Sequence, residues 1–494
     1  MHDVSSLREI QRMREDLKAA QAFPYDETLA SVMVGPVFTC GPGEAVRNVA
    51  KEMSRRQISS VVVVGPGDEP VGILTERDIL NKIIAVDGLD MDRVRVSDVM
   101  TPDPVTLTPE DNIYRALSVL SAKGIKHLPL ASGGKVAGIV TLRQLLRLRH
   151  PEPMVIITKL HEARDVADLR DIKAELPRLA ASKLSLGISA YEIVRMISLI
   201  NQDIHRRVLE LALEASGPPP AGFCFFVTGS HGRMENHLTS DQDHGMILAD
   251  DADDLGYFMP LSALLSEWLA QAGFELCPGY IMAMNPIWRK RLSEWKRQTE
   301  YWFQVQVPHL IRYVTLIFDS KAVYGDASLF ASMSDHVHAL LGRHYEVLRI
   351  LREEEESHKI PVGLLGRFIT EKKGEHKGEM DVKRSGLRFI VEGVRILALL
   401  HGIRATSTRD RIDALVRGGH VHRDDGEFFS AAHEILLHFT LKTQVEKALA
   451  GLEVDSFIRP AALSQRDREM LRHAFKAVES LQDLIAGEFG QLVL

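Results

Sequence analysis

The sequence predicts a multidomain α+β protein, with a duplicated α/β unit, a central α/β domain and a helical carboxy-terminal domain. Four observations lead to this prediction. A chain of 494 residues is too long for a single hydrophobic core. Residues 36–148 contain one internal repeat, and two apolar runs in the middle of the chain have the length of buried strands. Beyond residue 324 the apolar residues recur at helical spacing to the end.

The composition excludes several classes of protein. Apolar residues make up 45% of the chain and charged residues 26%, as in folded globular proteins, and the net charge of −7 argues against a general nucleic-acid-binding surface. Three cysteines without metal-ligand spacing indicate neither a disulfide framework nor a zinc site. The amino terminus has no signal-peptide pattern, and no uncharged run is long enough for a membrane span. We therefore expect a cytoplasmic protein without nucleic-acid or membrane partners.

Residues 1–30 are expected to hold an amino-terminal helix, and residues 31–149 hold the repeat. Leu7, Ile10, Met13 and Leu17 have helical spacing. In the repeat, segment 42–46 corresponds to segment 109–113, and Gly72-Ile-Leu-Thr75 corresponds to Gly138-Ile-Val-Thr141. The offset changes from 67 to 66 residues, so one intervening turn differs in length by one residue. Each copy predicts strand, helix, strand, turn, strand and helix, with strands at 60–64 and 71–74 and at 127–130 and 137–140.

This repeat resembles a pair of cystathionine-β-synthase (CBS) domains. The stretch 72–79, Gly-Ile-Leu-Thr-Glu-Arg-Asp-Ile, resembles the family's adenosine-nucleotide motif, which implies that Thr75 and Asp78 contact the phosphate and ribose of AMP, ADP or ATP. The alternative is a capping box at a strand-to-helix junction, which Thr141 and Gln144 could also form in the second copy. Because Gln144 replaces the family's aspartate, we predict one nucleotide site, near Thr75 and Asp78. The resemblance also implies a homodimer, since CBS pairs commonly associate face to face.

Residues 150–215 are expected to form a helical connector. Ile193, Ile197 and Ile200 have helical spacing, and Gly217-Pro-Pro-Pro220 then marks a boundary because prolines fix the backbone and remove hydrogen-bond donors.

The domain predicted at 216–335 carries the residues on which the functional prediction depends. The apolar run 223–227 is a predicted strand that breaks at Gly229-Ser230 into a segment able to begin a helix, and 243–248 is a second predicted strand. Side chains two apart on a strand share a face, so Asp241 and Asp243 should point the same way. Two neighbouring carboxylates suit Mg²⁺ shared with substrate phosphates, and a glycine beside a helix start lets phosphates approach the backbone. Each feature alone is common in solvated turns, but the combination favours nucleotidyl transfer.

The same segment carries a resemblance to a known family. Gly-Ser followed by Asp-x-Asp resembles the polymerase-β nucleotidyltransferase superfamily, and GSHGRMENHLTSDQD resembles the domain related to protein-PII uridylyltransferases. This resemblance implies a third carboxylate from a neighbouring strand, and segment 313–319 fits because its apolar residues lead into Asp319. It implies that Asp241, Asp243 and Asp319 hold Mg²⁺ and carry the reaction, and that Gly229, Ser230 and Arg233 bind the NTP.

Residues 336–494 are predicted to form a helical domain. The segment 381–387 followed by Ile390, Val394, Leu397 and Leu400 indicates an amphipathic helix with a polar entry. It resembles the helical domain that accompanies this transferase family, which implies that Lys383 contacts substrate. The cations Arg289, Lys290, Arg291 and Lys296 could reach a triphosphate, although a solvated helix face is the more common explanation.

The leading hypothesis is a signalling nucleotidyltransferase. It would transfer a nucleoside monophosphate from an NTP to a protein or small-molecule hydroxyl with Mg²⁺, under the control of an adenine nucleotide bound to the CBS pair. A PII-like acceptor protein is what the resemblance implies. The alternative is a non-catalytic nucleotide-sensing regulator whose transferase-like domain only binds a partner, and the intact Asp-x-Asp weighs against it.

Overall fold

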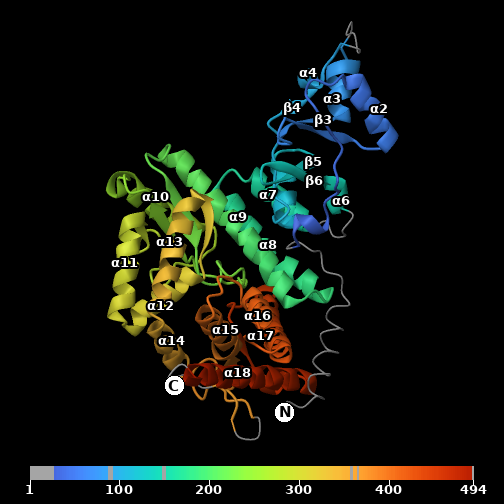
Figure 1. Ribbon diagram of the computed structural model, residues 1–494. Coiled ribbons are helices and arrows are strands. Elements are labelled where there is room, and N and C mark those ends of the chain that lie inside the picture. The colour runs from blue at the N-terminus through green and yellow to red at the C-terminus, as the bar shows by residue number, and fades with distance from the viewer. Residues whose placement is uncertain (1–26, 87–92, 147–151, 357–359, 364–366, 492–494) are drawn as a thin grey trace. The chain divides into compact units, whose positions relative to one another are not determined.

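The computed structural model describes residues 27–86, 93–146, 152–356, 360–363 and 367–491 (Figure 1). These residues form two compact units, one up to residue 162 and one from residue 163 onward, which we call the amino-terminal and carboxy-terminal units. The helix predicted from Leu7, Ile10, Met13 and Leu17 lies outside the described residues. The predicted α+β multidomain class is confirmed.

The amino-terminal unit is the predicted duplication. Helices α2 and α5 begin at Val46 and Ile113, and strands β2 and β5 at Ser60 and His127, so both pairs are 67 residues apart. In each copy the two main strands form an antiparallel pair, β2 with β3 and β5 with β6. The elements in order are β1 (Thr39–Cys40), α2 (Val46–Arg56), β2 (Ser60–Val64), β3 (Pro70–Thr75), α3 (Glu76–Ile79) with the π-helical turn Leu80–Ile84, α4 (Val96–Val99), β4 (Thr101–Pro102), α5 (Ile113–Ala122), β5 (His127–Ser132), β6 (Lys135–Thr141), α6 (Leu142–Leu146) and α7 (Glu152–Glu162).

The two copies meet through equivalent positions. The Ser60 hydroxyl and His127 Nδ1, which correspond to each other in the repeat, are hydrogen-bonded at 2.9 Å. Val62 and Ile73 of the first copy share a buried cluster with Ile139 of the second. The copies are therefore packed as an approximately symmetric pair.

A four-stranded sheet forms the centre of the carboxy-terminal unit. Its strand order is β10-β7-β8-β9, with β7 (Phe223–Val227) and β8 (His244–Leu248) in the middle, β9 (Arg289–Arg291) parallel to β8, and β10 (Lys321–Gly325) antiparallel to β7. Every residue of β7 and β8 is buried, which explains why both appear in the sequence as continuous apolar runs. The predicted strands at 223–227 and 243–248 are confirmed.

Two local predictions were wrong. Residues 313–318 belong to helix α12 (Pro308–Phe318), which buries Ile311, Val314 and Phe318 at helical spacing, and strand β10 begins only after Asp319. A short apolar run satisfies both periods, so its sequence alone does not separate helix from strand. The helix expected after Gly229-Ser230 is only a turn, closed by the Arg233 N–H donating to the Gly229 carbonyl at 3.0 Å.

The segment expected to be a connector is divided between the two units. Helix α7 belongs to the amino-terminal unit, whereas α8 (Val166–Ser185) and α9 (Ala190–Ser216) belong to the carboxy-terminal unit. Both pack against α10 and α17, and α9 buries Ile193, Ile197 and Ile200. Helix α9 ends at Ser216, with Gly217 as its C-cap, before the three prolines.

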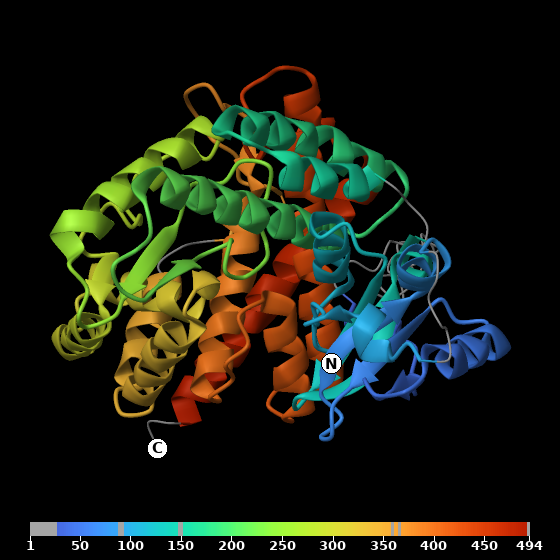
Figure 2. The same cartoon turned by 90° about the horizontal axis from the view of Figure 1, so that it is seen from above.

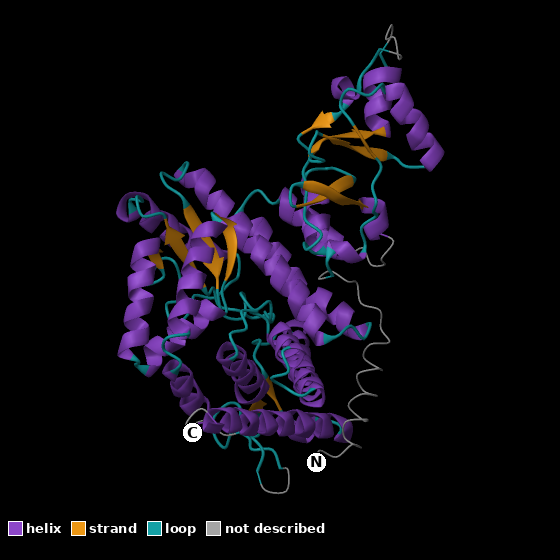
Figure 3. Ribbon diagram, viewed as in Figure 1, coloured by secondary structure: helices purple, strands orange, loops and turns teal. Residues whose placement is uncertain are grey.

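The rest of the carboxy-terminal unit is almost entirely helical, as predicted (Figures 2 and 3). Helix α15 packs against α14, α16, α17 and α18. None of the helices in the described ranges combines the length and apolar character that a membrane span requires. The elements are α10 (Met259–Gln271, preceded by the π-helical turn Asp254–Phe258), α11 (Leu292–Val305), α13 (Ala327–Leu341), α14 (Glu346–Glu356), β11 (Met380–Asp381), α15 (Arg388–Leu400, preceded by the π-helical turn Lys383–Leu387), α16 (Thr408–Arg417), α17 (Arg423–Leu449), β12 (Phe457–Ile458) and α18 (Gln465–Gln491).

Candidate active site

The Gly-Ser turn lies directly against the Asp-x-Asp segment. The Thr228 N–H donates to the Asp243 carbonyl at 3.0 Å. Gly229 has a φ of +63°, in the left-handed region that favours glycine, and a Cβ there would lie 3.3 Å from Asp243 Oδ2. A Cβ on Gly232 would lie 1.8 Å from the Asp319 carbonyl oxygen. Both glycines are therefore needed for this close packing.

The two carboxylates of Asp241 and Asp243 come just before strand β8. Gln242 and His244 are fully buried on the opposite side of the chain, where Gln242 Oε1 and His244 Nε2 lie 3.2 Å apart. The chain turns tightly here, because the Asp243 N–H donates to the Asp241 carbonyl at 3.2 Å, and the charge of Asp241 lies near enough to act on the Asp243 carboxylate.

The electrostatics of this pair favour a cation. Burial raises the pKa of Asp243 to about 6; a hydrogen bond from the Cys277 thiol opposes the rise and the charge of Asp241 adds to it. Burial also raises the pKa of Asp241, against the effect of Lys383. Asp243 Oδ1 is buried and has no hydrogen-bond partner among the described residues. Mg²⁺ is usually held by one or two carboxylates plus substrate phosphates, so this donor set fits Mg²⁺.

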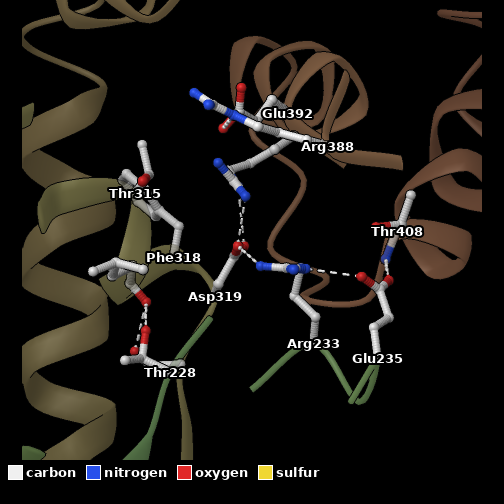
Figure 4. Close-up of polar contacts among 12 residues, drawn as sticks. Thr228, Arg233, Glu235, Thr315, Phe318, Asp319, Arg388, Glu392 and Thr408 are labelled. Carbon is white, nitrogen blue, oxygen red and sulfur yellow. Dashed lines mark hydrogen bonds and ion pairs between the residues drawn. The ribbon is translucent and has the colours of Figure 1, made fainter. Parts of the chain in front are cut away.

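Asp319 is not part of this pair. It is fully buried at the end of α12 and forms ion pairs with Arg233 at 2.7 Å, Arg395 at 2.8 Å and Arg411 at 2.8 Å. Figure 4 shows the contact between Asp319 and Arg233. Although burial alone would raise the pKa of Asp319, the three guanidinium groups hold it below its usual range. Over the described ranges, no three His, Cys, Asp or Glu side chains form a group that could hold a metal ion. Among the described residues Asp319 therefore forms no metal-binding group with Asp241 and Asp243, and both of its oxygens accept from arginines instead.

Arg233 and Glu235 tie the turn to the carboxy-terminal helices. Arg233 Nε donates to Glu235 at 2.8 Å, and Glu235 accepts the Thr408 N–H at the start of α16 at 2.7 Å. Figure 4 shows this chain of contacts running from Asp319 through Arg233 to Glu235 and Thr408.

A cavity of about 700 Å³ opens between the Gly-Ser turn and helices α12 and α15. Gly229, Ser230, Arg233 and Lys383 all line it, so four predicted substrate residues meet at one cavity. The positive charge of Lys383 also lowers the pKa values of Asp241 and Asp243, against the effect of burial on both. The charged lining residues are the cations Arg233, Arg312, Lys383, Arg384, Arg388 and Arg395 and the acids Glu235, Asp381 and Glu392.

The amino-terminal unit has a capping box at the predicted nucleotide motif and another at the corresponding position of the second copy. The Thr75 hydroxyl donates to Asp78 at 2.6 Å, and the Thr141 hydroxyl donates to Gln144 at 2.9 Å. Asp78 also pairs with Lys82 at 3.0 Å. A cavity of about 590 Å³ is lined by Thr141 of the second copy but by neither Thr75 nor Asp78. Its other lining residues are Ser59, Glu76, Lys126, His127, Leu142 and Arg143.

Comparison with known families matches three regions of the chain. Residues 29–85 and 96–150 match the CBS domain, residues 174–309 match "Putative nucleotidyltransferase DUF294", and residues 346–489 match "Putative nucleotidyltransferase substrate binding domain". The chain belongs to the CBS-domain proteins with a DUF294 region.

Similarity to individual proteins is concentrated in about a quarter of this CBS–DUF294 chain. An uncharacterized protein of Methanopyrus kandleri is 35% identical over 136 residues, which are 26% of this chain and 67% of that protein. A solved structure of an uncharacterized conserved protein from Pyrococcus horikoshii is 26% identical, with a TM-score of 0.24, and covers 25% of this chain and 92% of its own. CBSX2, solved in complex with AMP, is 20% identical, with a TM-score of 0.23, and covers 24% of this chain and 94% of its own.

The cations predicted from the segment 289–296 stabilise the DUF294 region itself. Arg289 is buried in an ion pair with Asp254, and Arg291 donates to the Ala252 carbonyl at 2.7 Å. Lys296 donates to the Ser332 hydroxyl at 3.0 Å. Their bonds therefore hold β9 and α11 in place.

Sequence reasoning missed Arg395 and Arg411 of the substrate-binding domain. Arg395 interrupts the most apolar stretch of α15 and is only 10% exposed. A charged residue in the middle of an apolar helical face needs a buried partner, and this is the signal that could have identified it.

Proposed function

We propose that the carboxy-terminal unit is a nucleotidyltransferase that transfers a nucleoside monophosphate from an NTP to a hydroxyl group of a protein or small molecule. The observation that carries this proposal is the Asp241–Asp243 pair beside Gly229 and Ser230. One buried carboxylate oxygen of the pair lacks a partner among the described residues, and a cationic cavity adjoins the turn.

Asp241 and Asp243 would hold Mg²⁺. When bound, the ion would neutralise phosphate charge and help stabilise the charge that develops during the transfer. Asp319, which our sequence analysis included in this set, is left out of the proposed metal site because its oxygens accept from arginines.

The cavity lining supports a triphosphate as the substrate. Gly229 has no Cβ, so phosphate oxygens can approach the backbone, and Ser230 offers a hydroxyl. Arg233 and Lys383 add positive charge, and the lining as a whole has six Lys and Arg side chains against three Asp and Glu. Charge-assisted hydrogen bonds to phosphate are among the stronger polar contacts in proteins.

The remaining cavity would take the acceptor. Leu316, Val391 and Ile396 give part of the lining apolar character. This is compatible with an aromatic or aliphatic hydroxyl next to the phosphates. A tyrosine of a PII-like protein is one such acceptor and follows from the resemblance to PII uridylyltransferases.

The CBS pair is proposed to regulate this activity by binding AMP, ADP or ATP. Thr75 and Asp78 are the proposed contacts in the first copy, where the capping box fixes both side chains at the end of β3. The cavity lined by Lys126 and Arg143 of the second copy and by Ser59 and Glu76 of the first is a second place where a phosphate would find positive charge. A homodimer formed through the CBS pairs, acting in the cytoplasm, completes the proposal.

The test is transfer of label from α-³²P-labelled ATP, UTP, GTP and CTP in the presence of Mg²⁺ and cell extract. We expect a labelled protein band or small molecule with the wild-type chain and none with the Asp241→Ala, Asp243→Ala double variant. Asp251→Ala, an exposed carboxylate just after β8, is the matched control and should transfer as wild type. Full transfer by the double variant refutes the mechanism. Absence of transfer from all four nucleotides by the wild type favours the non-catalytic alternative.

A further inference from the structure

Asp319 organises three arginines that come from three different segments. Asp319 Oδ1 accepts from Arg395 Nε at 3.2 Å and pairs with Arg411 Nη2 at 2.8 Å, while Oδ2 accepts from Arg233 Nη1 at 2.7 Å and pairs with Arg395 Nη2 at 2.8 Å. Arg233 is on the Gly-Ser turn, Arg395 on α15 and Arg411 on α16. One buried carboxylate therefore sets the position of guanidinium groups from the turn and from two helices.

Two of these arginines reach the cavity and the third does not. Arg233 and Arg395 line it, and their side chains are 13% and 10% exposed. Arg411 is 1% exposed and is not a lining residue. A guanidinium group has five N–H donors, and the pairing with Asp319 takes Nε and Nη2 of Arg395 but not Nη1. In Arg233, Nε donates to Glu235 and Nη1 to Asp319, which leaves Nη2 outside these two pairings.

We propose that Asp319 is a positioning residue that holds Arg233 and Arg395 at the cavity lining, where their remaining N–H groups bind the phosphates of the NTP. Arg395 is thereby assigned as a phosphate-binding residue. This inference rests on the proposed function, since it takes the cavity to be the NTP site. It gives Asp319 a role in the reaction without contact with the metal ion.

Charge and position predict opposite effects when Asp319 becomes asparagine. The substitution removes one negative charge next to three arginines, so charge alone would strengthen the binding of an anion. Asparagine, however, has a single acceptor oxygen for three guanidinium groups, and its NH₂ group faces their donors. If Asp319 acts by positioning, Arg233 and Arg395 lose their fixed orientation, and anion binding weakens.

The experiment is calorimetric titration of the full chain with inorganic tripolyphosphate and Mg²⁺, which needs neither an acceptor nor transfer. We expect Asp319→Asn and Arg395→Gln each to weaken binding about tenfold or more, as for the loss of a charge-assisted contact. Arg395→Lys keeps the charge but loses the fork that pairs with Asp319, so it should also weaken binding. Arg404→Gln is the control, because Arg404 is 59% exposed and pairs with the exposed Asp335.

Thermal melting is measured for each variant. If Asp319→Asn does not fold, the two Arg395 variants decide the outcome. Folded variants of Asp319 or Arg395 that bind tripolyphosphate as tightly as wild type, or more tightly, overturn the proposal, as does a wild-type chain that does not bind it. Failure of label transfer in the wild type, with tripolyphosphate binding weakened as expected, would instead count against the proposed function and leave the phosphate site standing.

Discussion

Gly229 and Asp243 are in contact across the Gly-Ser turn, with the place of a Cβ on residue 229 only 3.3 Å from Asp243 Oδ2. Gly229 also has a left-handed φ of +63°, a backbone conformation that residues with side chains rarely adopt. A side chain at residue 229 would therefore strain the backbone and crowd the Asp243 carboxylate.

We expect Gly229→Ala to abolish nucleotidyl transfer while lowering stability only moderately. An alanine in the left-handed region costs about 1–2 kcal/mol, and its methyl group would press on the Asp243 carboxylate. Label transfer and urea unfolding measure the two effects. Gly222→Ala is the control, because its Cβ would have Ala249 as its nearest neighbour at 3.8 Å. A Gly229→Ala variant with normal transfer would contradict the proposed role of this turn.

Asp243→Asn should stabilise the protein at neutral pH although it removes activity. The folded pKa of Asp243 is about 6, above the unfolded value of about 3.9. Between these values the folded state binds more protons than the unfolded state, so stability falls as pH rises. At pH 7.5 the charged carboxylate costs about 3 kcal/mol, and asparagine avoids this cost. Urea unfolding should show a gain for Asp243→Asn at pH 7.5 that shrinks toward pH 5, and a loss of stability at pH 7.5 would contradict it.

Five buried histidines should make the carboxy-terminal unit sensitive to acid. Burial lowers the pKa values of His205 and His433 to about 4 and those of His231, His237 and His244 well below the usual 6.5. Below pH 6.5 the unfolded chain binds protons that the folded chain does not. The free energy of unfolding therefore decreases as the pH is lowered. Melting temperatures measured from pH 8 to pH 5 should decline, steeply below about pH 6.5. An equal melting temperature at pH 7 and pH 5 would show that these rings are not held neutral.

The strands β7 and β8 could be predicted because each is a short apolar run bounded by turn-forming or polar residues. Segment 313–318 has the same appearance but lies in α12, where Pro308 begins a helix whose buried residues Ile311, Val314 and Phe318 recur at helical spacing. Local pattern does not separate these cases, because an apolar run of six residues fits both periods.

The position of Asp319 at the end of an apolar run could be seen in the sequence, but its environment could not. Arg233, Arg395 and Arg411 lie between 76 and 92 residues away along the chain, and only tertiary packing brings them to one carboxylate. By contrast, the Gly229-Ser230 turn and the Asp241–Asp243 pair are neighbours in sequence. Strand β7 leads into the turn and strand β8 follows the pair, so the pairing of these two strands holds the turn and the carboxylates together.

Asp78→Asn distinguishes the two places where the CBS pair could bind an adenine nucleotide. Asparagine would lose the ion pair with Lys82 and weaken the capping box, at a cost of about 1 kcal/mol. If the site is in the first copy, AMP binding to the full chain, measured by calorimetry, should weaken for Asp78→Asn and remain for Arg143→Gln. The reverse pattern would move the site to the cavity lined by Thr141 and Arg143. Asp68→Asn, an exposed change in the turn between β2 and β3, is the control.

Lys383→Gln should raise the KM for the NTP about tenfold, because it removes a positive charge from the cavity lining. Stability should change little, because the Lys383 side chain is exposed. Lys383 lowers the pKa values of both carboxylates, so its loss should also move the acidic limb of the activity profile to higher pH. Lys377→Gln, an exposed change a few residues earlier, controls for the loss of a positive charge. A KM that rises without any movement of the acidic limb would place the Lys383 ammonium group on the phosphates alone, away from the carboxylate pair.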